Sequence, residues 1–162
     1  MLFPLVDNMG NVRSLQLRCV IDHGEQCRAK SVALKPQKRG LVLANRAGLA
    51  LLRRDPGRSK FWEGVPDVVI VEGETDFLCA AIEETDTMRA VFGISSGAWS
   101  DAHALAIPED ARVIVATDAD QAGNKYADQI RETLGTRLFL RWTPNQGTDV
   151  CDAGGLAGGT VT

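Results

Sequence analysis

Acidic side chains follow two apolar runs of the chain, at the points where each run ends. Glu72 comes directly after the run at 68–71, and Asp118 and Asp120 come shortly after the run at 112–116. Carboxylates held close together repel one another, so such a cluster is stable when a cation neutralises it. Oxygen ligands favour Mg²⁺ or Mn²⁺ over zinc. The three carboxylates are therefore predicted to bind divalent cations if the fold brings the two run ends together.

The residues from 67 onward have the pattern of strands that alternate with helices. Strands are predicted at 68–71, 90–94, 112–116 and 137–142. Helices are predicted at 74–84, at 101–107 with Ser100 as the N-cap, and at 121–134. This order predicts an α/β fold, a mainly parallel sheet with helices on both faces. Sites in such sheets lie at the carboxyl ends of the strands. Because strand side chains alternate between faces, Asp118 and Asp120 are expected to project to the same side there, near Glu72.

Residues close to these carboxylates in the sequence are further candidates for the site. Asp76 lies in the first turn of the helix after Glu72, where the helix dipole favours a negative charge. It could orient Glu72 or a metal-bound water. Gly73 and Gly123 would let the backbone approach a phosphate closely, and Lys125 could neutralise a phosphate oxygen.

The first 66 residues differ from the rest in both pattern and charge. A hairpin is predicted from residues 2–6 and 12–19, a strand at 41–44 and a helix at 46–54. This part holds 12 Lys and Arg against 5 Asp and Glu, whereas residues 67–162 hold 6 against 16. The asymmetry suits a basic surface that follows a phosphate backbone beside an acidic pocket. On charge alone, a solvated basic face is the simpler interpretation.

These patterns predict three parts of the chain. Residues 1–66 form a small, β-rich, basic N-terminal subdomain, and residues 67–152 form the α/β domain. Residues 153–162 are rich in glycine and are predicted to be a flexible tail.

The four cysteines are scattered along the chain and are expected to be reduced thiols. Cys19, His23 and Cys27 have ligand types that bind zinc, but a structural zinc needs four ligands and only three are present. The segment around His23 is therefore interpreted as a turn between two strands.

Length and composition limit the class of protein. The chain has 162 residues, of which 44% are hydrophobic and 24% are charged, as in a globular domain. No run approaches the roughly 18 apolar residues of a membrane span, and the first residues lack the pattern of a signal peptide. A cytoplasmic protein without a membrane partner is expected.

Two stretches resemble the motifs of a known domain. Residues 68–76, VVIVEGETD, resemble the first motif of the Toprim (topoisomerase-primase) domain, an apolar strand followed by EGxxD. Residues 113–123, VIVATDADQAG, resemble its second motif, a strand followed by DxDxxG. Within this superfamily the chain looks most like the primases of bacteria, phages and plasmids, because residues 119–123 with Lys125 are similar to their DxDxAGxxA signature. The hairpin at 3–16 is similar to the one that precedes Toprim in those proteins.

The resemblance implies roles for particular residues. Glu72 would be the catalytic glutamate and also a metal ligand, Asp118 and Asp120 would be metal-binding aspartates, and Asp76 would be the final acid of the first motif. Lys125 would join the catalytic residues. Asp149 loosely matches a further metal-binding acid that primases place after the fourth strand. The implied cofactor is Mg²⁺ or Mn²⁺, as two ions.

The activity implied by the resemblance is metal-dependent nucleotidyl transfer. A primase of this kind makes RNA primers on single-stranded DNA from nucleoside triphosphates, and a helicase or another replication protein would be its partner. The nucleic acid is predicted to contact basic residues of the N-terminal subdomain: Arg13, Arg18, Arg28, Lys30, Lys35, Lys38, Arg39 and Arg46. The zinc ribbon and the longer polymerase core of a complete bacterial primase are not matched. A fragment, a degenerate mobile-element remnant or one subunit of a split system would each explain this.

Other functions use similar residues. A Toprim nuclease would use the same carboxylates to activate water, and a non-catalytic primase remnant would only bind nucleic acid. A topoisomerase needs a tyrosine nucleophile on a separate domain, whereas Tyr126, the only tyrosine, falls in the helix after the second motif. A phosphatase or receiver domain also uses strand-end aspartates, but it does not explain Glu72-Gly73 followed by Asp76.

Overall fold

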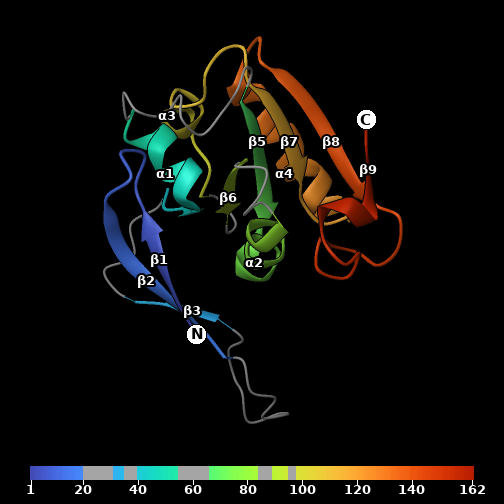
Figure 1. Cartoon of the computed structure of the whole chain (residues 1–162), viewed down its shortest axis with the longest axis horizontal. Coiled ribbons are helices and arrows are strands. Elements are labelled where there is room, and N and C mark those ends of the chain that lie inside the picture. The colour runs from blue at the N-terminus through green and yellow to red at the C-terminus, as the bar shows by residue number, and fades with distance from the viewer. Residues whose placement is uncertain (20–30, 35–39, 55–65, 84–88, 95–97) are drawn as a thin grey trace.

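The structure, a computed structural model, describes residues 1–19, 31–34, 40–54, 66–83, 89–94 and 98–162 (Figure 1). The strands are β1 Leu2–Val6, β2 Val12–Arg18, β3 Ser31–Ala33, β4 Leu43–Ala44, β5 Asp67–Glu72, β6 Ala90–Ile94, β7 Arg112–Ala116, β8 Leu138–Pro144 and β9 Gly159–Val161. The helices are α1 Arg46–Leu52, α2 Gly73–Glu83, α3 Asp101–Ala104 and α4 Gln121–Leu134, together with the short 3₁₀ helix η3 Leu156–Gly158.

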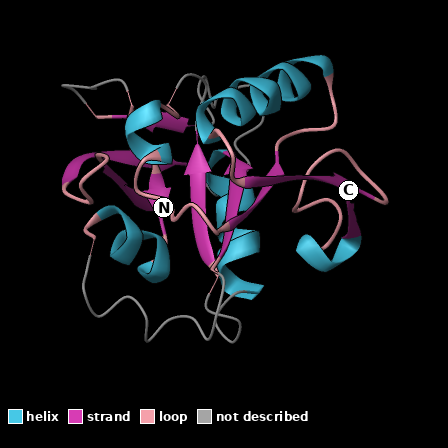
Figure 2. Cartoon of the chain, turned by 90° about the horizontal axis from the view of Figure 1, so that it is seen from above, coloured by secondary structure: helices cyan, strands magenta, loops and turns pink. Residues whose placement is uncertain are grey.

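Six strands form one sheet in the order β4-β6-β5-β7-β8-β9. The four central strands run parallel, and β4 and β9 pair antiparallel at the two edges. Helices cover both faces of this sheet (Figure 2). The predicted fold class, a mainly parallel sheet covered on both faces, is confirmed.

Alternation along the central strands divides the core into two layers. On β5, Val68 and Ile70 join the cluster that includes residues of α1, α3 and α4, whereas Val69 and Val71 join the cluster that includes α2 and the C-terminal segment. All four side chains are fully buried. Burial on both faces explains why the strand has a continuous apolar run instead of an alternating pattern.

Helix α4 begins and ends where its sequence signals place it. The Asp120 side chain caps it, because Oδ1 accepts a hydrogen bond from the Gly123 amide at 2.7 Å. Ala127, Ile130 and Leu134 form its buried face. Gly135 follows with a φ of 63°, which L side chains rarely adopt and glycine adopts without strain. The predicted helix at 121–134 is confirmed.

Helix α3 is shorter than the sequence predicts. The expected helix runs to residue 107, but α3 ends at Ala104 and turns lead to Pro108. A proline disfavours the helical conformation in the residue before it. Ser100 is at the N-cap position, yet its Oγ bonds to Nδ1 of His103 at 2.9 Å instead of a backbone amide.

The N-terminal subdomain contains the predicted hairpin. β1 and β2 pair antiparallel, and β3 adds a third strand. Phe3 and Leu5 of β1 pack in one cluster with Phe77 and Leu78 of α2. The strand predicted at 41–44 appears as β4 and pairs with β6 of the large sheet. The proposed boundary between residues 66 and 67 therefore does not separate the two sheets.

The C-terminal segment differs from its prediction as a flexible tail. Residues 153–162 include η3 and β9, and β9 pairs antiparallel with β8. The indole nitrogen of the buried Trp142 donates to the Leu156 carbonyl at 2.8 Å. A Cβ at Gly159 would clash with the Trp142 ring. The glycine content, interpreted as a sign of flexibility, instead allows the backbone to pack directly on this indole.

The expectation of reduced cysteines is also wrong for one pair. Cys79 of α2 and Cys151 form a disulfide across 72 residues of sequence, with their Cα atoms 5.6 Å apart. The sequence did not predict this disulfide, because Cys79 and Cys151 are far apart in the sequence and are brought together only by the fold. Cys19 is half-buried, and His23 and Cys27 lie outside the described residues.

No helix among the described residues is long and apolar enough to cross a membrane.

Candidate functional site

The fold brings the two acidic strand ends together. β5 and β7 are direct neighbours in parallel register, with Val71 opposite Ala116. Glu72 is the last residue of β5, and Asp118 follows β7 by two residues. The carboxylates therefore meet at the carboxyl-terminal edge of the sheet, where a site was expected from the topology.

Glu72 has an unusual environment for a carboxylate. Its side chain is half-buried, and it accepts a hydrogen bond from the backbone of Asp118. Its Oε2 is buried and has no hydrogen-bond partner among the described residues. Burial and the charge of Asp118 raise the pKa of Glu72 above its usual value. A buried carboxylate oxygen without a donor is costly, so this atom suits contact with a cation.

Asp118 shares this environment. Burial raises its pKa, and the charges of Asp149 and Asp120 act in the same direction, while Arg141 opposes them. The prediction that Asp118 and Asp120 project to the same side assumed that both continue the strand, but β7 ends at Ala116. Asp120 is instead exposed at the N-cap of α4, and its charge still reaches Glu72 and Asp118.

Asp76 is the most perturbed carboxylate of the group. Only 5% of the residue is exposed. Burial and the charge of Asp149 raise its pKa to about 7, with smaller contributions from Asp118 and Glu72. The Cys151 amide donates to its Oδ1 at 3.3 Å, which favours the charged form only in part.

Asp149 lies on a third loop that closes against the other two. Its Oδ1 accepts a hydrogen bond from the Asp152 amide at 2.7 Å. The Ala119 amide, between the two aspartates of the second motif, donates to the Thr148 carbonyl at 3.0 Å. Asp149 is thus held beside the second motif, as its charge effect on Asp118 also shows.

Sequence reasoning did not identify Arg141 as part of this site. It is half-buried on β8, and its guanidinium donates to the carbonyls of Thr117 and Asp118 at 2.9 and 3.2 Å. Burial lowers the pKa of Arg141, while Glu72 and Asp118 act in the opposite direction. The only available signal was a basic residue in a strand that is otherwise largely apolar, and its position beside β7 depends on strand order.

The donor set matches Mg²⁺ or Mn²⁺ in kind, since it consists of carboxylate oxygens. The unpartnered Oε2 of Glu72 and the raised pKa values of Glu72, Asp76 and Asp118 both indicate that positive charge would be favourable here. In the part of the chain that the structure describes, no group of three or more His, Cys, Asp or Glu side chains is arranged so that it could hold a metal ion. The carboxylates thus fit a divalent cation in chemistry and charge, but their arrangement in this structure is not that of a metal site.

Residues 69–153 match a family model described as Toprim-like. The chain belongs to the Toprim-like family. The match spans both acidic motifs and the loop that carries Asp149. The comparison with curated proteins finds no match.

Solved primase structures share the Toprim fold of this chain. The crystal structure of the primase fragment of the bacteriophage T7 primase-helicase protein is 18% identical, with a TM-score of 0.59 over 94% of this chain and 55% of that one. A T7 lagging-strand DNA polymerase structure contains primase domains bound to an RNA/DNA hybrid and dTTP. Its matching chain is 18% identical, with a TM-score of 0.59 over 91% of this chain and 66% of that one. The zinc-binding and RNA polymerase domains of the Aquifex aeolicus primase are 16% identical, with a TM-score of 0.60 over 99% of this chain and 40% of that one. The chain thus spans 40–66% of these proteins, and the likeness is one of fold.

The remaining predicted residues of the Toprim site take different positions. Lys125 is on the exposed surface of α4, and no hydrogen bond or ion pair within the described residues joins it to the carboxylates. Gly73 has a φ of 80° at the start of α2, with open space where a Cβ would be. At Gly123 a Cβ would clash with the Asp118 carbonyl. The glycine lets α4 pack against the backbone of the second motif.

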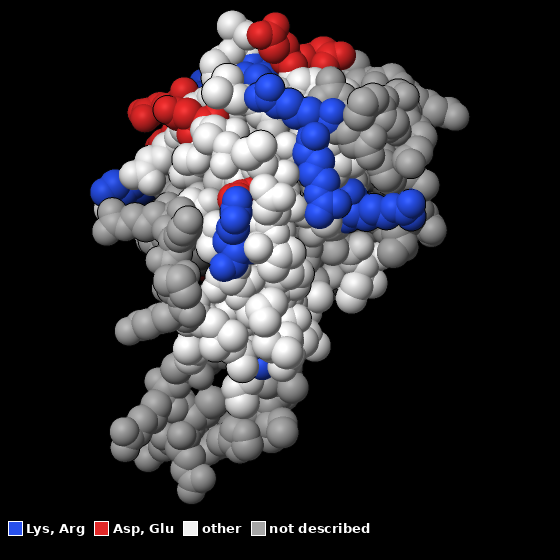
Figure 3. Space-filling model, turned by 90° about the vertical axis from the view of Figure 1, so that its left-hand side faces the viewer, with Lys and Arg blue, Asp and Glu red and all other residues white. Residues whose placement is uncertain are grey.

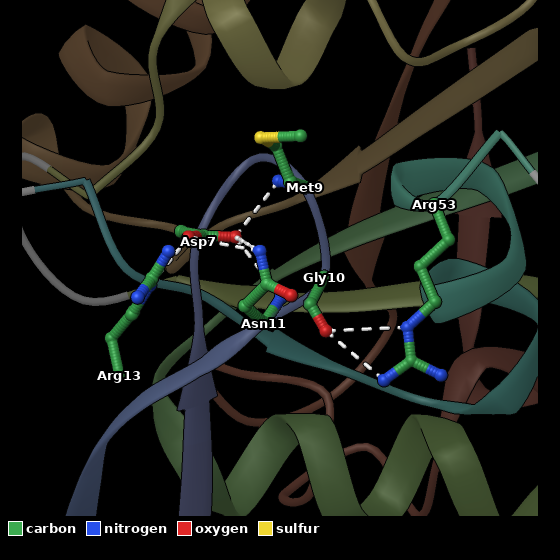
Figure 4. A network of polar contacts seen from close by, with 6 residues as sticks. All are labelled: Asp7, Met9, Gly10, Asn11, Arg13 and Arg53. Atoms are coloured by element: carbon green, nitrogen blue, oxygen red, sulfur yellow. Dashed lines mark hydrogen bonds and ion pairs between the residues drawn. The ribbon is translucent and has the colours of Figure 1, made fainter.

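Basic residues of the N-terminal subdomain have mixed roles. Arg13 pairs with Asp7 at 2.6 Å, within a turn that Asp7 also stabilises through the Met9 and Asn11 amides (Figure 4). Arg18 pairs with the buried Glu74 at 2.9 Å. Arg13 and Arg18, two of the eight predicted nucleic-acid contacts, therefore have partners within the protein.

Basic side chains also gather on one face of the molecule (Figure 3). Figure 3 shows Lys and Arg side chains gathered in a band on the side of the molecule that carries the N-terminal strands and α1. The exposed basic residues at the two ends of α1 are Arg46, Arg53 and Arg54. Five of the predicted contact residues lie outside the described residues: Arg28, Lys30, Lys35, Lys38 and Arg39.

Proposed function

We propose that this chain is the Toprim catalytic part of a primase-like enzyme, which joins ribonucleotides on a single-stranded DNA template by metal-dependent nucleotidyl transfer. The observation that carries the proposal is the buried, unpartnered Oε2 of Glu72 beside Asp118, at the strand-end edge of a Toprim fold. The likeness in fold to primase structures supports the choice of reaction.

The residues proposed to hold the cations are Glu72, Asp118, Asp120 and Asp149. When bound, two Mg²⁺ or Mn²⁺ ions would neutralise charge on the reacting phosphate groups. Glu72 already uses one carboxylate oxygen on the Asp118 backbone, which leaves Oε2 for a cation. Asp120 uses Oδ1 to cap α4, and this contact fixes the orientation of its side chain.

The protein groups around the carboxylates keep the site ordered. The buried Asp76 is tied to the third loop through the Cys151 amide, so it positions that loop against α2. Lys125 remains a candidate for contact with a phosphate oxygen from the surface of α4, and Gly73 leaves open space for the approach of one.

The proposed partners are single-stranded DNA, nucleoside triphosphates and a helicase or other replication protein, and the proposed location is the cytoplasm. The T7 protein is a primase-helicase, and the primase domains in the T7 polymerase complex are bound to an RNA/DNA hybrid and dTTP. The template is proposed to follow the basic face at α1. A phage or plasmid origin would be consistent with the likeness to the T7 proteins.

The test is incorporation of labelled ribonucleotides on single-stranded DNA in Mg²⁺ or Mn²⁺. Glu72→Gln is expected to lower incorporation by at least about 100-fold, because a lost charged ligand removes several kcal/mol of charge stabilisation. Glu132→Gln is the matched control, since Glu132 is an exposed acid on α4. It should behave like the parent.

Other outcomes would identify a different function. Nicking of plasmid or cleavage of single-stranded DNA that depends on Glu72, without synthesis, would show a Toprim nuclease. Salt-dependent DNA binding without either reaction would show a non-catalytic module. Incorporation that is equal in the parent and Glu72→Gln would overturn the proposed site.

A further inference from the structure

Arg141 is placed where the sheet ends beside the second motif. In the register between β7 and β8, Val115 opposite Arg141 is the last pair. The backbone of Arg141 bonds with Thr162 on its other side, through both its amide and its carbonyl at 2.9 Å. After Val115 the chain leaves this ladder, because it must turn into α4.

Beyond the last backbone pair, the Arg141 side chain donates hydrogen bonds to carbonyls of the segment that follows β7. Nη1 donates to the Val115 carbonyl at 3.0 Å, and Nη2 donates to the carbonyls of Thr117 and Asp118. Nη2 also lies 3.3 Å from Oδ1 of Asn124 in the first turn of α4. A planar guanidinium with several donors can satisfy such a set of acceptors from one position.

A second contact holds the same turn from within. Oγ1 of the buried Thr117 donates to the Gly123 carbonyl at 2.7 Å. Gly123 in turn packs against the Asp118 backbone without room for a Cβ. The turn from β7 to α4 is therefore fixed by packing on one side and by Arg141 on the other.

We propose that Arg141 is a positioning residue of the active site, which holds the backbone of Asp118 so that its carboxylate and that of Glu72 are arranged for a divalent cation. This inference rests on the cation site of the proposed function. Nη1 and Nη2 are engaged by acceptors of the protein itself, so Arg141 acts through Asp118 and does not bind a phosphate.

Arg137 provides a matched control. It is also half-buried, and its guanidinium also donates to backbone carbonyls, those of Ile107 at 2.8 and 3.0 Å and of Leu134 at 2.9 Å. It precedes β8 at the opposite end of the strand from the carboxylates. Loss of Arg137 therefore removes contacts of the same kind without touching the site.

The experiment compares Arg141→Met, Arg141→Lys and Arg137→Met with the parent chain. Hydrogen exchange of the metal-free protein is measured for peptides that cover residues 117–124, and Mn²⁺ affinity is measured by calorimetry. In both Arg141 variants, the backbone amides of residues 117–124 are expected to exchange faster than in the parent. Mn²⁺ affinity is expected to fall about 10-fold, as when a residue that supports a metal ligand is lost. Arg137→Met should change neither quantity, although it lowers the free energy of unfolding.

Arg141→Lys separates hydrogen bonding from charge, because one ammonium group keeps the charge but cannot reach all of these carbonyls. It also covers a failure of Arg141→Met to fold. Parent-like exchange and affinity in Arg141→Lys, or exchange in 117–124 that is unchanged in Arg141→Met, would overturn the proposal. If the parent bound no Mn²⁺, the proposed function would fail, and the exchange data would still decide whether Arg141 holds the turn.

Discussion

The surroundings of the Asp76 side chain destabilise its charged form. Its side chain is buried beside Asp149, Asp118 and Glu72, and these surroundings raise its pKa to about 7. The unfolded chain, with an ordinary carboxyl, releases this proton near pH 4. The native state therefore binds more protons than the unfolded state between these two values. Stability from this group falls as pH rises through that window and stays low above it.

Asp76→Asn should remove this penalty while its Oδ1 still accepts from the Cys151 amide. Without divalent cations, the variant is expected to be more stable than the parent at pH 8, by no more than about 4 kcal/mol, which is the full linkage value for such a shift. Near pH 4 the two should be nearly equal. Urea unfolding from pH 4 to 8 with a chelator measures the difference. Equal stability of the two proteins at pH 8 would contradict it.

An exposed acid serves as the control for this measurement. Asp128→Asn changes a residue on the surface of α4 and removes the same formal charge. Its difference from the parent should show no comparable dependence on pH.

At the scale of the elements, the sequence predicted the strands and helices around the site well. The bounds of β6, β7 and α4 match the predictions, since each has local signals such as an apolar run, a cap or a terminal glycine. The carboxylates at the ends of β5 and β7 were found for the same reason. The motif glycine Gly123 was also selected from local signals, and a Cβ there would clash with the Asp118 carbonyl.

Features that depend on distant parts of the chain were missed. β9 exists because Gly159 packs on Trp142, a contact that glycine content alone cannot reveal. Arg141 acquires its role from the neighbourhood of β8 and β7, and Cys79 meets Cys151 across 72 residues. In each case the partner is chosen by strand order or packing and not by spacing in the sequence.

The disulfide joins two elements of the site, α2 and the loop that carries Asp149. In the chain-entropy model, a link across 72 residues stabilises by about 4 kcal/mol. Reduction of the parent should lower the free energy of unfolding by up to this amount, as measured by urea unfolding with and without dithiothreitol. The double variant Cys79→Ser, Cys151→Ser should not respond to reductant.

Cys19→Ser is the control for reductant effects outside this pair. It should keep the full response of the parent. A parent whose unfolding is the same with and without reductant would show that the link contributes nothing to stability.

At the scale of the whole molecule, the charge is divided between a basic first part and an acidic second part. Several acidic groups lie together at the strand-end edge, and exposed arginines lie at the two ends of α1. Because Arg46, Arg53 and Arg54 are exposed at the two ends of α1, we take α1 as a candidate for contact with a phosphate backbone.

Arg46→Ala with Arg54→Ala should therefore weaken binding of single-stranded DNA. If each arginine neutralises one phosphate, the plot of log affinity against log salt should become shallower by about 1.4. Fluorescence anisotropy over a range of salt concentrations measures this slope. Arg112→Ala is the control, because the Arg112 guanidinium already pairs with Asp67. A slope that is the same in the double variant and the parent would exclude α1 as the contact.

The pairing of Thr162 with Arg141 has a practical consequence for work with this chain. Both backbone groups of Thr162 bond to the residue whose side chain supports Asp118. A truncation after residue 153, chosen because the segment is rich in glycine, would remove β9 and η3 and uncover Trp142. Such a truncation would thus remove the backbone partner of Arg141 and weaken its support of Asp118. Loss of activity in the shortened protein would therefore not identify the catalytic residues of the longer chain.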